Sequence, residues 1–172
     1  MTKETINENK SPLLRAGDLA SLIECGGVYY NVPGTSSKEL LAGLIDLLPP
    51  FSLDPKDLYR EILEREALSS TGIDRGIALP HPRSPLLGED DAPFIALAFP
   101  AQPIDWNNPD GGEVHTVFLI ISSSAKQHLN TLTKINYLCR QEQFYSLIKT
   151  RASQEEIIAA IREAEAGWAE KT

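Results

Sequence analysis

The chain has 172 residues, 42% of them hydrophobic and 23% charged, a length that suits one domain with a substantial buried core. Sixteen Lys and Arg against 24 Asp and Glu give a net charge of -8, which argues against a partner nucleic acid or an anionic membrane. No apolar run approaches the roughly 18–20 residues that span a bilayer, so we expect no direct membrane insertion. The N-terminus has no apolar signal segment, so we expect a cytoplasmic protein.

The first half of the chain predicts a flexible arm over residues 1–14 and then a single domain over residues 15–172. Asp18, Ser36 and Asp54 are favourable N-cap residues, and each precedes apolar residues at helical spacing. Gly26-Gly27 ends the first helix and Pro49-Pro50 ends the second. The expected elements are a helix over 19–25, a strand over 28–32, a helix over 37–48, a helix over 55–67 and a short buried strand over 76–79.

The second half predicts two strands followed by helices. The run over 114–122 is the longest apolar strand, which suits the centre of a sheet. The other expected elements are a strand over 94–99, a helix beginning near Lys126, a short helix over about 142–149 and a final helix opened by Ser153 and Glu156. On the helix from Lys126 we expect a buried side formed by Leu129, Leu132, Ile135, Leu138 and Cys139. These elements predict the α/β class: a mixed β-sheet flanked by helices in a single-domain sandwich.

The two cysteines, Cys25 and Cys139, lie far apart in the sequence and show no metal-ligand spacing. We therefore expect reduced thiols in packed positions. No H-x-x-x-H or C-x-x-C pattern is present, so no metal is expected. A serine hydrolase lacks its G-x-S-x-G signal, and no glycine-rich nucleotide loop is present, so no cofactor is expected.

His81 stands at the end of the short apolar strand, between Pro80 and Pro82. Because prolines have a fixed φ and no amide hydrogen, they end the strand and hold the backbone around the histidine stiffly. An imidazole that titrates near neutral pH can act as a base, a nucleophile or a metal ligand. The residues around His81 do not by themselves decide between these roles.

Five further positions could assist His81. His128 lies near a predicted helix start, where exposed amides favour anions, and Arg65 at the end of the third helix could match an anionic group. The loop residues Ser69, Ser70 and Thr71 could supply donors to the same anion, although all of these residues also have ordinary structural readings. For His115, at the start of the long strand, we favour a structural role. A nucleophilic histidine, a second histidine at a helix start and an arginine together suit a transient phosphoryl group.

The segments Arg65-Glu66, Ser70-Thr71-Gly72-Ile73 and Gly76-Ile77-Ala78-Leu79-Pro80-His81 closely resemble a signature of the bacterial phosphotransferase system. The family is the enzyme IIA domain of the fructose/mannitol type, which includes the nitrogen-regulatory IIA proteins. The resemblance covers about residues 18–165, and His128-Leu129 followed by Leu132 matches the family's later histidine segment. By this resemblance, His81 would accept a phosphoryl group from an HPr-type phosphocarrier protein and pass it on, which makes the chain a phosphotransferase. Arg65 and His128 would stabilise the phosphoryl charge.

The resemblance leaves two roles open. The chain could pass phosphate to a IIB component for sugar uptake, or it could act as a nitrogen-regulatory binding module that controls protein partners through the phosphorylation state of His81. No IIB or IIC unit is fused to the chain, which favours the regulatory role mildly. Pro82-Arg83 departs from many transport-type members, where a small residue and then Lys or Arg follow the histidine, and the turn before the long strand is slightly enlarged. A IIA-like fold with an inactive site is a third reading, against which the retention of Arg65, His81 and His128 argues.

Overall fold

The structure is a computed structural model that describes residues 18–87 and 91–170, so the arm expected over residues 1–14 lies outside the described residues. The elements follow the predicted order closely. They are α1 (Leu19–Gly26), β1 (Val28–Val32), α2 (Ser37–Leu47), α3 (Pro55–Leu68), β2 (Gly72–Ile73), β3 (Ile77–Ala78), β4 (Phe94–Pro100), β5 (Ile104–Asp105), β6 (Glu113–Val114), β7 (Thr116–Ile121), α4 (Ala125–Arg140), α5 (Glu142–Lys149) and α6 (Gln154–Glu170).

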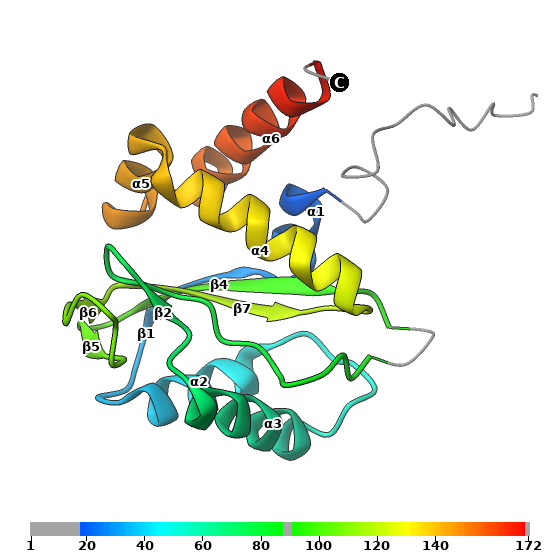
Figure 1. The fold of residues 1–172 in the computed structure, drawn as a ribbon, viewed down its shortest axis with the longest axis vertical. Coiled ribbons are helices and arrows are strands. Elements are labelled where there is room, and N and C mark those ends of the chain that lie inside the picture. The colour runs from blue at the N-terminus through cyan, green and yellow to red at the C-terminus, as the bar shows by residue number, and fades with distance from the viewer. Residues whose placement is uncertain (1–17, 88–90, 171–172) are drawn as a thin grey trace, which may run out of the picture.

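Five strands form one mixed sheet in the order β1-β4-β7-β3-β2, and β5 and β6 form a separate two-stranded sheet. Strand β7 runs parallel to β3 and antiparallel to β4 and lies at the centre of the sheet, as predicted. It is not the longest strand, because its six residues are fewer than the seven of β4. Helices α1, α4, α5 and α6 cover one face of the sheet, while α2 and α3 cover the other (Figure 1). The α/β sandwich with a mixed sheet is thereby confirmed.

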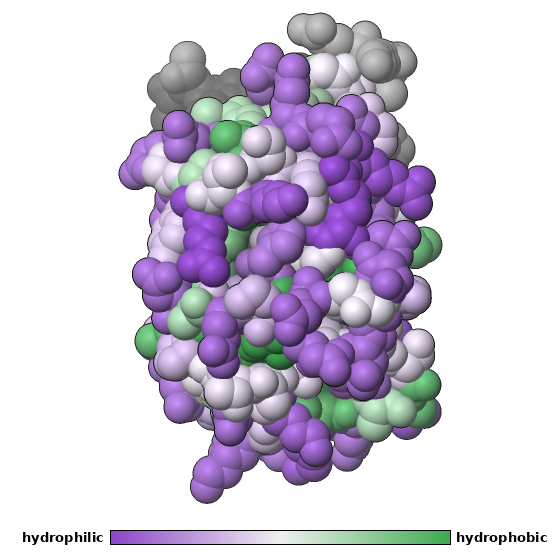
Figure 2. Space-filling view, turned by 90° about the vertical axis from the view of Figure 1, so that its left-hand side faces the viewer, coloured by the Kyte–Doolittle hydropathy of each residue, from purple (hydrophilic) through white to green (hydrophobic). Residues whose placement is uncertain are grey.

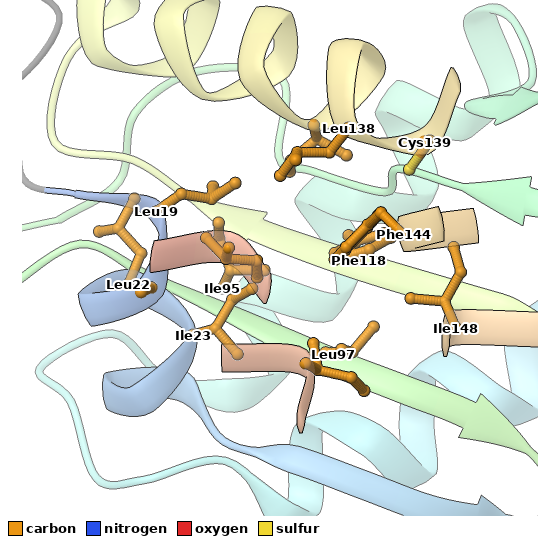
Figure 3. Close-up of a cluster of buried hydrophobic side chains, with 14 of the residues drawn as sticks. Leu19, Leu22, Ile23, Ile95, Leu97, Phe118, Leu138, Cys139, Phe144 and Ile148 are labelled. Carbon is orange, nitrogen blue, oxygen red and sulfur yellow. The ribbon is translucent and has the colours of Figure 1, made fainter. Parts of the chain in front are cut away.

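Both faces of the sheet are buried, and the two-residue period of a strand sends alternate side chains to opposite layers. Along β4, Ile95, Leu97 and Phe99 pack beneath α1 and its neighbours, whereas Phe94, Ala96 and Ala98 pack against α2 and α3. Figure 3 shows side chains of the first layer, among them Ile95 and Leu97, meeting residues of α1, α4 and α5. Because both layers are apolar, the central strands are fixed from two sides.

The helix starts have the caps that the sequence predicts. Asp18 accepts a hydrogen bond from Ser21 N at 2.7 Å, Ser36 accepts one from Glu39 N at 3.2 Å, and Asp54 accepts one from Lys56 N at 2.8 Å. Each bond satisfies an amide that the helix itself leaves unpaired. No helix within the described ranges is long and apolar enough to cross a membrane.

The predicted strand over 114–122 is interrupted at His115, which separates β6 from β7. The backbone amides of His115 and Thr116 both donate to the carbonyl of Gly76, at 2.8 and 3.2 Å. Two successive amides that bond to one acceptor break the alternation of a regular strand. The two residues before this break therefore pair with β5 in the second sheet.

Two predicted burial positions are wrong. Leu129 is 65% exposed. The inward face of α4 includes Gln127, Thr131, Lys134 and Leu138. Because Leu129 is two positions after Gln127, its side chain points to the opposite side of the helix. Cys25 is exposed near the end of α1, whereas Cys139 is buried as expected. Burial raises the pKa of the Cys139 thiol to about 12, so this thiol stays protonated and packs as an apolar group.

The side of the molecule where β5, β6 and α5 lie is mostly hydrophilic, and its apolar patches are small and separate (Figure 2). Strand β7 ends and α4 begins at the other end of the sheet (Figure 1). His128 lies in the first turn of α4, and His81 follows β3, which runs parallel to β7. The candidate site therefore lies away from this polar side.

Gly26 brings α1 into direct contact with the backbone of β4. A Cβ at Gly26 would stand 2.1 Å from the Ile95 carbonyl oxygen, so we expect Gly26→Ala to destabilise the protein by about 2 kcal/mol through forced separation of α1 from the sheet. Gly43→Ala on α2 is the matched control, since the nearest atom to its Cβ is 3.9 Å away. We expect this control to be neutral or stabilising by about 0.5–1 kcal/mol, as for glycine to alanine in a helix. Urea unfolding measures both, and equal stability of the two variants would contradict the expectation.

Candidate functional site

His81 follows the short strand β3 and is carried by a tightly bonded segment. Leu79 N donates to the Thr71 carbonyl at 3.0 Å, and the Pro80 carbonyl accepts from Ile120 N of β7 at 3.0 Å. Pro80 has no amide hydrogen, so the strand ends here and the chain leaves the sheet. The stiff backbone that the flanking prolines predict is thus fixed on both sides by neighbouring segments.

The His81 ring is oriented by the backbone two residues before it. His81 Nδ1 lies 2.8 Å from the Leu79 carbonyl oxygen. Because a carbonyl oxygen can only accept, this bond requires a proton on Nδ1. In the neutral ring, Nε2 then carries the lone pair that a nucleophile needs.

His128 from the first turn of α4 stands beside His81. Their ring centroids are 4.4 Å apart and the rings are inclined at 50°. Both rings line a cavity of about 210 Å³, whose other walls are Pro82, Arg83, Ser84, Pro85, Ile120, Ser122 and Ala125. Ala125 is the first residue of α4, so the positive end of a 16-residue helix borders the cavity. The cavity therefore combines two imidazoles with a helix start that favours an anion.

Arg65 lies in the last turn of α3, where it donates from Nη1 to the Ser69 carbonyl at 3.0 Å. Its positive charge reaches both rings, because it lowers the pKa of His81 and that of His128. The guanidinium group has five N–H donors, so the bond to Ser69 leaves others for an anion. The structure thus places His81 and His128 side by side, and Arg65 lies close enough for its charge to act on both rings.

Both histidines at the cavity favour the neutral form. Burial lowers the pKa of His81, and the hydrogen bond to the Leu79 carbonyl opposes this decrease. The charge of Arg65 lowers the pKa further, whereas the charge of Glu66 raises it. Burial, then the neighbouring His81 and Arg65, lower the pKa of His128 to about 4. Both rings are therefore uncharged at pH 7 when no anion is bound.

The loop over 69–71 occupies the end of α3, but its polar groups have other partners. The Ser70 hydroxyl donates to the Trp106 carbonyl at 2.6 Å and accepts from Gly72 N at 3.0 Å. Thr71 donates from its amide and its hydroxyl to the Glu66 carboxylate, at 2.8 and 2.6 Å. Ser69 is exposed and offers its carbonyl to Arg65. These bonds stabilise the loop itself, and a direct contact of these hydroxyls with an anion stays a prediction.

His115 lies away from the cavity and has structural partners. Its Nε2 lies 2.9 Å from the Arg75 carbonyl and its Nδ1 lies 2.7 Å from Thr116 Oγ1. Gly76 allows this approach, since its φ is +77° and an added Cβ would stand 2.4 Å from the His115 ring. The structural role favoured from the sequence agrees with these contacts.

Three residues at the site were not assigned a role from the sequence. Arg83 and Ser122 line the cavity, and Glu66 binds Thr71. Ser122 had one signal in the sequence, namely a polar residue directly after the apolar run of the central strand and before a predicted helix start. Glu66 had none beyond its place beside Arg65, because its partner lies in the next loop.

Comparison with known proteins gives the family. The family model "Phosphoenolpyruvate-dependent sugar phosphotransferase system, EIIA 2" matches residues 21–164. A nitrogen regulatory protein of Pseudomonas aeruginosa is 32% identical over 123 residues, which are 68% of this chain and 77% of that protein. A fructose-like EIIA component of the Escherichia coli phosphotransferase system is 32% identical over 117 residues, 66% of this chain and 76% of that protein.

A solved structure is similar as well. The crystal structure of nitrogen regulatory protein IIA-Ntr from Neisseria meningitidis superimposes with a TM-score of 0.69 at 27% identity, over 78% of this chain and 92% of that chain. The family match includes His81, which follows β3, and the helix with His128. The chain belongs to the EIIA type 2 family of the phosphoenolpyruvate-dependent sugar phosphotransferase system.

Proposed function

We propose that His81 Nε2 accepts a phosphoryl group from an HPr-type phosphocarrier protein and passes it to a IIB component. One observation carries this proposal: the bond from Nδ1–H to the Leu79 carbonyl leaves the lone pair of the neutral ring on Nε2, on a histidine that lines a cavity. Family membership supports the reaction class, since EIIA domains are phosphoryl carriers of this system.

The proposed transfer between two histidines accounts for all bonds and electrons without a metal or a nucleotide. The Nε2 lone pair forms the new N–P bond while the N–P bond of the donor's phosphohistidine breaks, and the bonding pair returns to the donor imidazole. The Nδ1–H proton stays on His81, where the Leu79 carbonyl stabilises the positive charge that the phosphorylated ring gains. Phosphoryl transfer of this kind depends mainly on in-line positioning and on donors for the equatorial oxygens.

The remaining groups of the site supply those donors. Arg65 offers a fixed positive charge, and the first turn of α4 offers the positive end of a helix dipole. His128 is neutral before transfer and 4.4 Å from His81 between ring centroids, so it can donate an N–H to a phosphoryl oxygen. The added negative charge raises its pKa, which strengthens that hydrogen bond.

A regulatory role is the second candidate. The nitrogen regulatory protein and the fructose-like EIIA component are each 32% identical to this chain, so similarity favours neither role. In the regulatory role, the same phosphohistidine changes which protein partner binds. The chemistry at His81 is common to both candidates.

Incubation with phosphoenolpyruvate, enzyme I and HPr is expected to add one acid-labile phosphoryl group to the protein, and His81→Ala is expected to take up none. Intact-protein mass spectrometry at neutral and acidic pH measures the label. His115→Gln is the matched control, because that ring lies outside the cavity, and we expect it to be labelled as the wild type is. Labelling of His81→Ala at the wild-type level would falsify the assignment.

His128→Ala is expected to keep the fold and to slow onward transfer about 10²-fold, because a donor to the phosphoryl oxygens is lost. Rapid-quench measurement of phosphate transfer to IIB gives the rate, and circular dichroism checks the fold. Thr133→Ala on the exposed side of α4 is the control and should transfer at the wild-type rate. Unchanged rates in both directions for His128→Ala would reduce His128 to a structural residue.

The stability of the wild type is expected to fall as the pH falls from about 6.5 toward 4. The pKa of His128 is about 4 in the folded protein and about 6.5 in the unfolded chain, so between these values the unfolded chain binds more protons. His128→Gln should therefore show a smaller decrease over this window, with an unchanged slope above pH 7. Urea unfolding at a series of pH values measures it, and identical pH slopes in the two proteins would contradict the assigned protonation state.

A further inference from the structure

Glu66 and Thr71 form a two-bond clamp between the last turns of α3 and the residue that precedes β2. The two carboxylate oxygens of Glu66 accept from Thr71 N at 2.8 Å and from Thr71 Oγ1 at 2.6 Å. Thr71 is only 6% exposed. Water therefore does not easily replace the carboxylate, and removal of Glu66 leaves buried donors unpaired.

The clamp continues to the His81 ring through the backbone. The Thr71 carbonyl accepts from Leu79 N at 3.0 Å, and the Leu79 carbonyl lies 2.8 Å from His81 Nδ1. The Leu79 peptide groups are thus held by Thr71 on one side and hold the ring on the other. A chain of four hydrogen bonds joins the Glu66 carboxylate to the imidazole.

On the β7 side, the backbone that carries the acceptor of His81 Nδ1 is held by the pairing of β3 with β7 and by the bond from Ile120 N to the Pro80 carbonyl. On the β2 side, the bond from Leu79 N to the Thr71 carbonyl holds it. Pro80 cannot donate, and β2 and β3 are two residues long each, so on this side the ladder consists of Gly72 and Ile73 paired with Ala78 and Ile77. Short strands of this kind contribute few ladder bonds. If Thr71 moves, Leu79 loses its partner, the Leu79 carbonyl turns, and the tautomer with the proton on Nε2 becomes competitive.

We propose that Glu66 is a positioning residue of this site, which acts through Thr71 and Leu79 to hold His81 in the tautomer with an unprotonated Nε2. The expected effect of Glu66 on the rate of phosphoryl transfer rests on the proposed function, whereas its effect on the tautomer of His81 does not. Glu66 touches no reacting atom. It determines which nitrogen of His81 is available to react.

Glu66 also acts on His81 through its charge, and the two effects can be separated. The carboxylate raises the pKa of His81 and so opposes Arg65. Glu66→Gln keeps both hydrogen bonds, because the amide oxygen accepts from Thr71 N and the Thr71 hydroxyl can turn to accept from the amide NH₂. Glu66→Ala removes both bonds and the charge.

The tautomer of His81 is measured first, by ¹⁵N NMR of the unphosphorylated protein. Glu66→Ala is expected to give a mixture of tautomers. Glu66→Gln is expected to keep the wild-type tautomer, with a lower pKa for His81 because the carboxylate charge is gone. Thr71→Val, which removes one bond of the clamp, should give a smaller shift toward the mixture, and Thr71→Ser should match the wild type. These readouts need no phosphodonor.

The rate of phosphoryl uptake from phosphorylated HPr is measured second. Glu66→Ala is expected to lower the maximal rate at least about tenfold while the KM for HPr stays within about twofold, since positioning is lost and docking is not. Glu66→Gln should stay within about threefold of the wild-type rate. Glu64→Ala is the control and should leave the tautomer and the rate unchanged. Glu64 is exposed on the same helix, where its Oε1 lies 3.9 Å from Arg60 Nε.

A folded Glu66→Ala protein with the wild-type tautomer overturns the proposal, whatever its rate. If Glu66→Ala does not fold, Thr71→Val decides, and a wild-type tautomer in that variant overturns the proposal as well. Failure of the proposed function is a different outcome, namely a wild-type protein that takes up no phosphate while the tautomer still responds to Glu66→Ala.

Discussion

The Leu79 backbone is bonded in two directions, and the chemistry of the site depends on it. Its amide donates to Thr71 and its carbonyl lies 2.8 Å from His81 Nδ1. The next carbonyl, that of Pro80, accepts from Ile120 in the central strand. Successive backbone groups before His81 are therefore hydrogen-bonded, so the His81 ring is less mobile than the side chain of an ordinary loop residue. A nucleophile that is already oriented spends less free energy on alignment when a donor arrives.

The two apolar layers make this arrangement rigid. Strand β7 lies between β4 and β3 and is buried on both faces, and its end supplies Ile120 and Ser122 to the cavity. Helix α4 begins directly after this strand and is anchored by Ile135 and Leu138 in the core. The core thus fixes the position of His128 relative to His81. Packing far from the cavity sets the 4.4 Å separation of the two rings.

Local signals in the sequence predicted most of the fold, because caps, proline stops and apolar periods act over a few residues. Asp18, Ser36 and Asp54 each cap the helix they were expected to cap. The break at His115 could not be predicted, since it depends on a carbonyl 39 residues away in the chain, that of Gly76. Leu129 was misplaced because polar Gln127 and Thr131 occupy the inward face of α4, which a pattern of apolar residues does not reveal.

The site shows the same division between local and distant information. The residues around His81 predicted a stiff histidine, whereas its grouping with Arg65 and His128 was inferred from residue types far apart in the sequence and gained a specific role from the family resemblance. The partners of Ser70 and Thr71 are a carbonyl at Trp106 and a carboxylate at Glu66. Nothing in a Ser/Thr-rich loop distinguishes a hydroxyl that is already bonded from one that is free for an anion. Tertiary contacts decide that point, and here they direct the loop toward supporting the histidine.

Transport and regulation place the same demand on the interior of the cavity and different demands on its surroundings. A phosphoryl group transferred to a neutral imidazole that keeps its Nδ1 proton adds net negative charge, and both proposed roles require that charge to be held at His81. Transfer requires the partner's reacting atom to reach Nε2 in line, whereas regulation requires only that a partner bind the two states with different affinity. Leu68 after Arg65 and Leu129 after His128 are each 65% exposed and offer apolar contact next to the site. Because the groups that we propose to hold the phosphate serve both roles, we expect the residues that decide between the roles to lie on this outer surface.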